Sequence, residues 1–567
     1  MSDIISAFLR ADQVYEQVFV GIFRYAAPIL ACVLLLRCVY PLLSFRREPE
    51  IWAWLHLAGN RKLPVTHWEN VIGRSKHSDI VIDFPTVSRS HCVLNRISKG
   101  GWVIVDTDSK DGVYVNGNRV PTCAVNAEDI ISVGGVEMRL KPITAEQERQ
   151  LSQLRTKASS VLSSIANVFL LTIFQLLCCM AYLLGGNEQY IGDVLFGFAG
   201  IVFSQWMLLV FYCGLQRTSF EIETIAFFLC TLGMAVIATV TPGEAVKQMI
   251  SMMMGIFLFL VIGWSLRSLE TAKIIRRIAA YAGVGLLVIT LLFGQTYYGA
   301  KNWLLIGSLS VQPSELTKVC FVFVGASAMD RILTKRNLIL FIMYSAVICG
   351  CLALMNDFGT ALIFFFSFLV IAYMRSGSLG TIGLACTALA FAGVVALKIA
   401  PHALQRFTSW RHIWEDPLNA GYQQTRALMC MASGGLLGIG PGKGLMKTLF
   451  AADSDMVVAT LSEEWGLSML AVAILCVIAL AVFSVRAAAI GRSSFYIIGA
   501  CTASGILVVQ TILNALGAVD VLPLTGVTFP FLSNGGSSMI CAWGLLAFIK
   551  AADTRRDASF AVRRRNG

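Results

Sequence analysis

Charged side chains are scarce in this sequence. Only 14% of the 567 residues are Asp, Glu, Lys or Arg, while 56% are hydrophobic; an ordinary soluble domain has about a quarter of its residues charged. This shortage excludes a soluble globular protein of this length. Apolar runs long enough to cross a bilayer, which takes about 20 residues of helix, recur after residue 160. The composition therefore predicts a polytopic α-helical membrane protein.

Paired cysteine motifs are also missing. None of the 16 cysteines forms a C-x-x-C pair, and most lie inside apolar runs, as Cys178 and Cys349 do. Cysteine in such a run behaves as a small hydrophobic residue. No His, Cys and Asp cluster has the spacing of metal ligands, and His402 and His412 are interpreted as loop residues. The sequence thus argues against a disulfide framework and a zinc site.

A basic surface interleaved with aromatic residues is absent too, although the formal net charge is +11. The cations instead gather in alternate connections between apolar runs, which is typical of cytoplasmic loops under the positive-inside rule. We therefore expect no nucleic-acid partner. The basic clusters are Arg267, Lys273, Arg276 and Arg277; Arg331, Lys335 and Arg336; and Arg555, Arg556, Arg563, Arg564 and Arg565.

The N-terminal part predicts one span and a soluble domain. The apolar run at residues 19–43, within an N-terminal segment of residues 1–45, lacks a basic n-region and a cleavage pattern and is interpreted as a retained span. Arg46 and Arg47 follow it, whereas Arg10 is the only cation among residues 1–18, so we expect the N-terminus outside. Residues 50–142 alternate in short apolar and polar runs and predict a cytoplasmic β-sandwich.

A linker at residues 143–160 then leads to twelve further expected spans and a basic cytoplasmic tail at 552–567. Two of these spans occupy 161–216, and the others fall in 220–551, which gives about 13 spans in all. Their ranges are 161–184, 194–215, 222–241, 248–266, 278–298, 315–330, 338–355, 359–374, 379–399, 457–485, 495–519 and 537–551.

The outer segment at residues 400–456 contradicts the charge pattern, because it carries cations on the side that should be poor in them. Its glycines, between 434 and 444, favour close packing or approach to a ligand. We interpret the segment as an extracytoplasmic anion site; a folded surface loop with solvated charges is the alternative. The cations are Arg406, Arg411, Arg426, Lys443 and Lys447.

Ionisable residues next to apolar spans are candidate site residues, because charge at membrane depth is costly. Glu315 and Lys318 share one helical face, where they either serve the site or form a structural ion pair. Asp357 should lie near the outer surface, where it either serves the site or caps a helix. Asp455 stands where the long loop meets the next span, followed two turns later by Glu463 and Glu464, and these acids are alternatively helix caps.

Four ordered motifs in the β region resemble a forkhead-associated (FHA) domain. They are Gly73-Arg74-Ser75, Ser88-Arg89-Ser90-His91, Asp111-Gly112 and Asn116-Gly117. The resemblance implies binding of a phosphothreonine-containing protein or peptide through Arg74, Ser88, Arg89 and Asn116, while His91 fixes a loop. An arginine fork and a hydroxyl suit a phosphate with nearly two negative charges. Asp111 stands where the family usually has Asn, and a sandwich used only for docking is the alternative.

Five ordered motifs from about residue 220 to 551 resemble the SEDS family, the RodA, FtsW and SpoVE type of peptidoglycan glycosyltransferases, which has a ten-helix core. Met456, Asn356, the Lys301-Asn302 pair and Asn534 depart from the family's usual residues, whereas Asp455 keeps the acid of its Thr-Asp-Phe motif. The motifs are Lys301-Asn-Trp with Gln312-Pro-Ser-Glu-Leu-Thr-Lys318; Asn356-Asp-Phe-Gly-Thr360; Gly421-Tyr-Gln with Gly434-Gly-Leu-Leu-Gly; Ser454-Asp-Met with Glu463-Glu464; and Pro523-Leu-Thr-Gly with Pro530-Phe-Leu-Ser-Asn-Gly-Gly-Ser-Ser538.

This resemblance implies an inverting glycosyltransferase that polymerises lipid II at the outer face of the cell membrane. Asp455 would be the general base that activates the acceptor hydroxyl, and a class B penicillin-binding protein would be the partner. A divalent cation, Mg²⁺ or Mn²⁺, stays open as an assistant through substrate phosphates. The candidate substrate-binding residues are Lys318, Glu315, Asp357, Arg406, Arg411, Lys443, Glu463, Glu464 and Ser537.

Two other functions compete with polymerisation: a lipid II flippase and a noncatalytic cell-division scaffold. A flippase needs charges along a path through the bundle, whereas the candidate charges gather toward the outer end. The retained Asp455 argues against a scaffold. The motifs leave open whether the protein serves elongation, division or sporulation.

Overall fold

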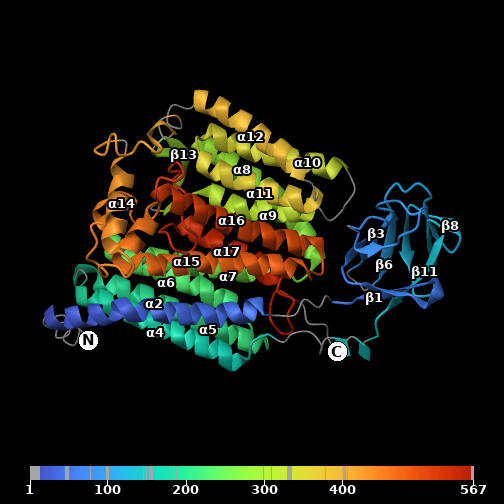
Figure 1. Ribbon diagram of the computed structural model, residues 1–567, viewed down its shortest axis with the longest axis horizontal. Helices are drawn as coiled ribbons and strands as arrows, with labels where there is room; N and C mark the ends of the chain where they lie inside the picture. Colours follow the sequence, from blue (N-terminus) through green and yellow to red (C-terminus); the bar gives the residue numbers. More distant parts are fainter. Residues whose placement is uncertain are drawn as a thin grey trace.

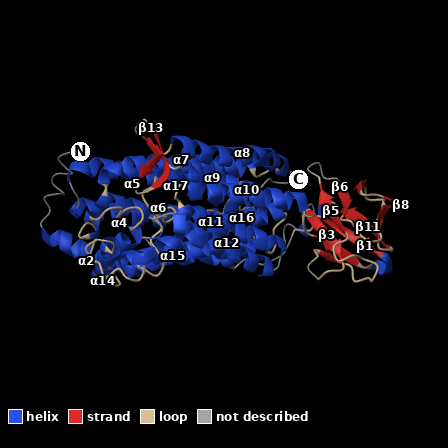
Figure 2. Ribbon diagram, turned by 90° about the horizontal axis from the view of Figure 1, so that it is seen from above, coloured by secondary structure: helices blue, strands red, loops and turns tan. Residues whose placement is uncertain are grey.

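A long helical bundle and a β-sandwich beyond one end of it make up this computed structural model (Figures 1 and 2). We call the end of the bundle next to the β-sandwich the sandwich end, and the other the opposite end. The structure describes residues 13–44, 50–76, 78–97, 101–144, 146–147, 150–151, 158–185, 188–297, 299–307, 309–328, 335–376, 379–399, 404, 407–419 and 421–562.

Thirteen helices of 16 to 32 residues build the described part of the bundle. Eight are long and apolar enough to cross a membrane, and shorter apolar helices lie among the rest. The predicted fold class, a polytopic helical protein with a β-sandwich, is confirmed. The helices are α2 (Gln13–Leu43), α4 (Val161–Gly185), α5 (Ile191–Gly214), α6 (Glu221–Val240), α7 (Ala245–Ser265), α8 (Leu269–Phe293), α9 (Pro313–Ala328), α10 (Lys335–Leu354), α11 (Phe358–Ser376), α12 (Leu379–Ile399), α15 (Val457–Ala488), α16 (Ser494–Ala518) and α17 (Gly536–Ala551).

The three helices α2, α4 and α5 pack along one side of the bundle, against α6 (Figure 1). Polar side chains tie them together inside an apolar setting. The Nε of Arg37 donates to Asn167 Oδ1 at 2.7 Å, and Gln175 Nε2 donates to Gln205 Oε1 at 3.0 Å and to Thr231 Oγ1 at 3.1 Å. Buried polar groups need such partners, so these bonds fix which helix faces meet.

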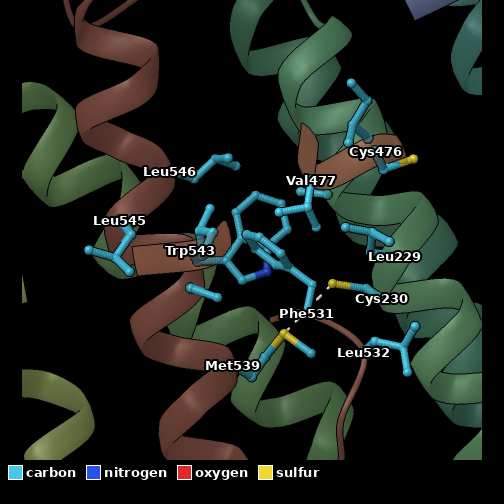
Figure 3. Close-up of a cluster of buried hydrophobic side chains, with 14 of the residues drawn as sticks. Leu229, Cys230, Cys476, Val477, Phe531, Leu532, Met539, Trp543, Leu545 and Leu546 are labelled. Carbon is cyan, nitrogen blue, oxygen red and sulfur yellow. Dashed lines mark hydrogen bonds between the residues drawn. The ribbon is translucent and has the colours of Figure 1, made fainter. Parts of the chain in front are cut away.

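Aromatic and aliphatic side chains fill the centre of the bundle (Figure 3). Trp543 on α17 is fully buried and meets Phe531 edge-on, with ring centroids 5.8 Å apart. Phe531 belongs to the segment between α16 and α17, which therefore enters the bundle instead of passing over its surface. Gly233 on α6 allows this entry, since a Cβ there would lie 2.3 Å from the carbonyl oxygen of Leu532.

The opposite end carries structure that the sequence did not predict. A three-stranded sheet, β12 (Gln295–Tyr297), β13 (Ala300–Ile306) and β14 (Leu309–Val311), lies between α8 and α9. Short turns join its antiparallel strands, and Gly299 and Gly307 have the positive φ that tight hairpins require. The described part of the long segment before α15 contains α14 (Tyr422–Gly434) and a short 3₁₀ turn, η4 (Met446–Thr448).

Two antiparallel-rich sheets form the β-sandwich, with strand orders β2-β1-β11-β10-β7-β8 and β4-β3-β5-β6-β9. Inward residues such as Leu55, Ile104 and Leu140 are fully buried between them. The strands are β1 (Ala53–Leu57), β2 (Lys62–Val65), β3 (Glu69–Gly73), β4 (Ile80–Val81), β5 (Cys92–Arg96), β6 (Trp102–Asp106), β7 (Val113–Val115), β8 (Asn118–Arg119), β9 (Thr122–Val125), β10 (Ile130–Val133) and β11 (Val136–Pro142).

The described part of the C-terminal tail, residues 552–562, packs against the sandwich end of the bundle. Phe560 is fully buried, and its carbonyl accepts a hydrogen bond from Arg267 Nε at 2.6 Å. Arg555 bonds Asp553 at 2.8 Å and Glu221 at 3.4 Å. The cation pattern alone suggested a simple basic tail, whereas here Arg555 is a buried member of an ion cluster.

Candidate functional site

A cavity of about 680 Å³ opens at the opposite end of the bundle. It draws its lining from segments far apart in the chain: the β12–β14 sheet, the start of α11, the segment before α15, and the segment between α16 and α17. Four of the five predicted motifs thus meet at one place. Its polar lining includes Asn302, Ser310, Gln312, Asn356, Asp357, Ser454, Asp455, Thr525, Thr528, Asn534, Ser537 and Ser538.

Asp455 lines this cavity and is half-buried, two residues before α15 begins. Its main chain is held by α16, because Asn514 Nδ2 donates to the Asp455 carbonyl at 2.9 Å and to the Val527 carbonyl at 2.7 Å. The preceding residue is held in the same way, since Ser533 Oγ donates to the Ser454 carbonyl at 2.7 Å. These bonds fix the acid relative to the segment between α16 and α17.

Asp357 is the second carboxylate of the cavity, and it is buried. Its Oδ1 accepts from the Thr360 amide at 3.1 Å, which makes it the cap of α11 that the sequence allowed. Its Oδ2 accepts from Asn302 Nδ2 at 3.0 Å and from Gln312 Nε2 at 3.4 Å. The capping role and the cavity position therefore coexist, and Asn302 and Gln312 join this carboxylate to the sheet and to the start of α9.

Ser537 also lines the cavity, at the start of α17. Its Oγ accepts a hydrogen bond from the backbone amide of Gln312 at 3.0 Å, so it links α17 to the residue before α9. Beside it, Ser538 Oγ and Thr528 Oγ1 lie 2.7 Å apart. These hydroxyls give the cavity hydrogen-bonding groups of the kind that can pair with the hydroxyl groups of a sugar.

Glu315 and Lys318 do not line the cavity in the described structure. Lys318 Nζ lies 2.6 Å from Glu315 Oε1, and both side chains are almost completely buried. This is the structural ion pair that the sequence left as the alternative. A buried pair of this kind compensates its own charge, so Lys318 has no excess charge to offer a phosphate.

The predicted cations of the 400–456 segment are dispersed. Arg406 lies outside the described residues, although its neighbour Phe407 lines the cavity. Arg411 stacks on Trp410, with its guanidinium carbon 5.1 Å from the ring centroid, and its amide donates to Asp520 at 3.1 Å. Lys443 is exposed and does not line the cavity.

Glu463 and Glu464 lie at a kink of α15, where Gly466 has φ 86°. The Glu463 carboxylate accepts from the amides of Leu445 and Met446 at 2.9 and 2.8 Å. It therefore fixes the glycine-rich segment against α15. Glu464 is buried, and its main chain packs against Gly438, where a Cβ would lie 2.2 Å from the Glu464 carbonyl oxygen.

The charge of the cavity differs from the expectation of cations around Asp455. Among the described lining residues, Asp357 and Asp455 are the only charged side chains. No group of three or more His, Cys, Asp or Glu that could hold a metal ion occurs in the described parts of the chain. The arrangement thus offers a general base and several hydrogen-bonding groups, and it leaves the phosphate-binding cations unassigned.

A second cavity, of about 600 Å³, lies beside the first and includes Tyr182, Tyr190 and Lys447 in its lining. Asp453 belongs to the wall between the two. Its Oδ2 accepts from Thr241 Oγ1 at 2.6 Å and from Asn534 Nδ2 at 2.8 Å, and these partners line the second and the first cavity respectively.

The predicted phosphate-binding residues of the β-sandwich occupy its loops. Arg74 directly follows β3 and is exposed, and Arg89 is exposed nearby. The Arg74 amide donates to the Ser88 carbonyl at 3.0 Å, which brings the two loops together. His91 is buried and joins the Ser88 amide, at 3.1 Å, to the Gly112 carbonyl, at 3.0 Å, so it fixes the loops as expected.

Asn116 and Asp111 lie on either side of β7, in two different loops of the β-sandwich. Asn116 has φ 52° in the turn between β7 and β8, where its Nδ2 donates to Asp129 Oδ1 at 2.8 Å. The hydrogen bond from the Asn126 amide, together with the one from Asn116, lowers the pKa of Asp129. Asn116 therefore anchors a turn in this structure, while Asp111 is exposed in the loop before β7.

Sequence reasoning missed Asn514, Asp453 and Thr241. A signal for Asn514 existed, because it is an amide inside the apolar run at 495–519, and polar residues at membrane depth are functional candidates. Asn514 is uncharged, so the cost of a buried charge did not point to it. Thr241 had no comparable signal, since a lone threonine at the end of a span is common.

Comparisons with known proteins agree with the motifs. The family model "Cell cycle protein", of the FtsW, RodA and SpoVE type, matches residues 238–557, and an FHA domain model matches residues 70–134. The chain is 29% identical over 267 residues to "Peptidoglycan glycosyltransferase RodA" of Mycobacterium tuberculosis (strain ATCC 25618 / H37Rv), covering 44% of this chain and 57% of the relative. It thus spans little more than half the length of that relative.

A second relative and one solved structure also match the chain. "Probable peptidoglycan glycosyltransferase FtsW" of Nitrosococcus halophilus (strain Nc4) is 34% identical over 287 residues, covering 48% of this chain and 73% of the relative. A chain from the structure of a peptidoglycan synthase complex matches with a TM-score of 0.51 at 23% identity, covering 58% of this chain and 96% of that chain. The structural match supports the fold of the bundle.

Proposed function

The chain belongs to the FtsW, RodA and SpoVE family of cell cycle proteins and carries an FHA domain, and from this premise we propose that it is a peptidoglycan glycosyltransferase. It polymerises lipid II into glycan strands at the outer face of a bacterial cell membrane. One observation carries the proposal: Asp455, the acid of the family motif, lines a cavity of about 680 Å³ on which four motifs converge.

Asp455 acts as the general base in this proposal. It takes the proton of the acceptor sugar hydroxyl, which then attacks the anomeric carbon of the donor, and the lipid diphosphate leaves with inversion of configuration. A base must lie within about 3 Å of the hydroxyl it deprotonates, so its position has to be fixed. The bonds from Asn514 and Ser533 to the main chain of residues 454 and 455 support such fixing.

The two ends of the molecule support a division of roles. Strand β13, which contributes to the lining of the cavity, and the FHA domain lie at opposite ends of the bundle (Figure 1). We place the N-terminus and the cavity outside and the FHA domain and the C-terminus in the cytoplasm, where a phosphothreonine protein can reach Arg74. A class B penicillin-binding protein is the proposed partner for cross-linking the strands.

Asp455→Asn tests the proposal most directly. The amide keeps the shape of the side chain but cannot accept the proton, so we expect the rate of lipid II polymerisation to fall by about 10²-fold or more, within the range of general-base catalysis. The measurement is glycan strand formation from purified lipid II by the full chain, with its penicillin-binding partner present.

Asp520→Asn is a matched control, because Asp520 is another loop acid at the same end and bonds the Arg411 amide outside the cavity lining. We expect it to keep most of the activity. Full activity of Asp455→Asn would refute the role of the acid. Transport of fluorescent lipid II across proteoliposomes without polymer would instead favour a flippase.

A further inference from the structure

The FHA domain touches the bundle through a surface of its own, at the turn between α15 and α16. The carboxylate of Glu69, at the start of β3, accepts one bifurcated hydrogen bond from Ser493 Oγ, at 3.2 Å to Oε2 and 3.3 Å to Oε1. The amide of Trp68 donates to the Arg492 carbonyl at 2.7 Å. We call residues 68–69 with residues 492–493 the latch.

Aromatic and ionic contacts surround the latch. The Trp68 ring meets Tyr496 edge-on at 5.9 Å, and the Arg492 guanidinium lies 5.9 Å from the Trp68 ring and 3.6 Å from Glu50. Tyr496 in turn donates to the Leu266 carbonyl at 2.7 Å, at the end of α7. The sandwich therefore contacts residues held by two separate parts of the bundle.

Burial distinguishes this contact from a loose tether. Only 6% of Glu69 and 7% of Arg492 is exposed, and charged side chains are rarely buried this far unless partners compensate them. Ser493 is also the N-cap of α16, where it accepts from the Phe495 amide. The Glu69 carboxylate thus lies at the positive end of the α16 dipole, a favourable place for an anion.

The latch and the phosphopeptide loops sit at the two ends of one strand. β3 begins at Glu69 and ends at Gly73, directly before Arg74, a separation of about 16 Å at 3.3 Å per residue. Arg74 stays exposed. A phosphopeptide can therefore reach the loops at Arg74 while the latch contacts are formed. Any shift of β3 on binding would also displace Glu69.

The same turn, residues 489–493, joins α15 and α16, the two helices that position Asp455. α15 begins two residues after Asp455, and α16 supplies Asn514, which bonds the Asp455 carbonyl. Ser493 and Asn514 are separated by about 30 Å along α16, at 1.5 Å per residue. A movement of the turn along this helix would displace the support of Asp455.

We propose that the FHA domain is docked on the α15–α16 turn by the latch, and that phosphothreonine binding at Arg74 changes polymerisation at Asp455 through this helix pair. The regulatory part rests on the proposed polymerase function. It assigns the domain an intramolecular partner as well as a phosphorylated one.

Ser493→Asp separates the latch from helix capping. Aspartate keeps an N-cap oxygen for the Phe495 amide, but it places a second negative charge against Glu69. Combining it with Glu69→Gln removes the repulsion and restores a hydrogen bond, so the double variant should regain the contact. Ser493→Thr is the control, because it keeps both the hydroxyl and the cap.

Hydrogen exchange of the full chain in detergent tests the docking without any reaction. We expect slow exchange at residues 66–70 and 489–496 in the wild type and in Ser493→Thr. Exchange should become fast in Ser493→Asp and slow again in the double variant, because the Trp68 amide loses and regains its acceptor. Equal exchange in all four proteins would overturn the docking.

The coupling is tested with a phosphothreonine peptide selected from a degenerate library by binding to the full chain, and with its unphosphorylated form. In the wild type, we expect the phosphopeptide to change the polymerisation rate about fivefold or more, the lower end of typical coupling between sites, and to alter exchange at residues 451–458. Both effects should vanish in Ser493→Asp, although the peptide still binds.

The outcomes separate the two proposals. A wild type that forms no polymer, yet shows peptide-dependent exchange at 451–458, contradicts the proposed reaction and supports the coupling. An active wild type whose rate and exchange ignore the peptide, or a Ser493→Asp protein that responds as the wild type does, overturns the coupling.

Discussion

Main-chain carbonyls of three consecutive residues, 453 to 455, accept hydrogen bonds from groups outside their own segment. The donors are the Asn534 amide, the Ser533 hydroxyl and the Asn514 side chain. A turn residue so held loses conformational freedom before substrate arrives, which is the kind of preorganisation that a positioned base requires. Asn514 is the donor that comes from a helix, so it connects the acid to the rigid part of the bundle.

Asn514→Ala should therefore lower kcat more than it changes KM. The variant leaves the carbonyls of Asp455 and Val527 without their donor, and a displacement of about 1 Å can cost 10²-fold in rate. We expect kcat to fall about 10- to 100-fold in the lipid II assay, with the pH profile displaced as the surroundings of the acid change.

Thr511→Ala is the matched control for that variant. Thr511 is buried on the same helix, and its hydroxyl bonds the Leu507 carbonyl of its own helix. Its kcat should stay within about twofold of the wild type, since such a bond contributes little. A similar loss in both variants would show general damage to α16 and contradict a positioning role for Asn514.

Arg74→Ala should weaken the binding of a phosphothreonine peptide. Arg74 is exposed beside the Ser88 loop, and hydrogen bonds to charged groups contribute about 1.5–3 kcal/mol. We expect the Kd to rise about 10- to 100-fold by titration calorimetry. Arg139→Ala, on an exposed position of β11, should bind as the wild type does. Equal affinity of the wild type for the unphosphorylated peptide would refute a phosphate reader.

Helices could be predicted from the sequence and the short elements between them could not. Each expected span overlaps a helix of the described bundle, because a run of about 20 apolar residues has few other solutions in a membrane. The β12–β14 sheet was missed, since its strands have 3 to 7 residues and the expected span at 278–298 covered the first of them. Short strands carry little periodic signal.

The segment between α16 and α17 could also be predicted only in part: its place near the site could, but its path through the bundle could not. Its motif, from Pro523 to Ser538, placed it near Asp455 by resemblance, but its entry into the bundle depends on a gap in α6. That gap exists because Gly233 has no Cβ, which would clash with the Leu532 carbonyl at 2.3 Å. Sequence periodicity cannot reveal such a contact, because the partner is 299 positions away in the chain.

Gly233→Ala tests this packing. We expect the added methyl group to push residues 531–533 away from α6, at a cost of about 1–3 kcal/mol for overpacking, and the melting temperature to fall by a few degrees. Gly285→Ala on α8 is the control, because a Cβ there meets nothing within 4 Å, and Ala favours a helix over Gly. Thermal unfolding in detergent measures both; equal melting temperatures would contradict tight packing at Gly233.

The described basic residues Arg267 and Arg555 lie at one end of the bundle and the cavity at the other, as the proposed orientation in the membrane requires. Arg267, in the turn between α7 and α8, bonds the C-terminal tail, which packs at the sandwich end and also contains Arg555. The cavity lies at the other end, so the positive-inside rule favours the outer face that we propose for it. Loop charges in the sequence predict this orientation, which stays a prediction. The docking of the FHA domain depends on Trp68 and Ser493, which no charge pattern distinguishes.

Cysteine labelling in intact cells tests this orientation. Leu418, in the segment before α14, is 73% exposed, and Val81 on β4 is 42% exposed. A membrane-impermeant maleimide should label Leu418→Cys in intact spheroplasts and Val81→Cys only after permeabilisation, each measured above the wild-type level because 16 native cysteines are present. If Val81→Cys reacts first, the FHA domain faces outward and the cavity faces the cytoplasm. Lipid II presented outside could then not reach Asp455. Both proposals, polymerisation at the outer face and regulation by a cytoplasmic phosphothreonine protein, would have to be abandoned.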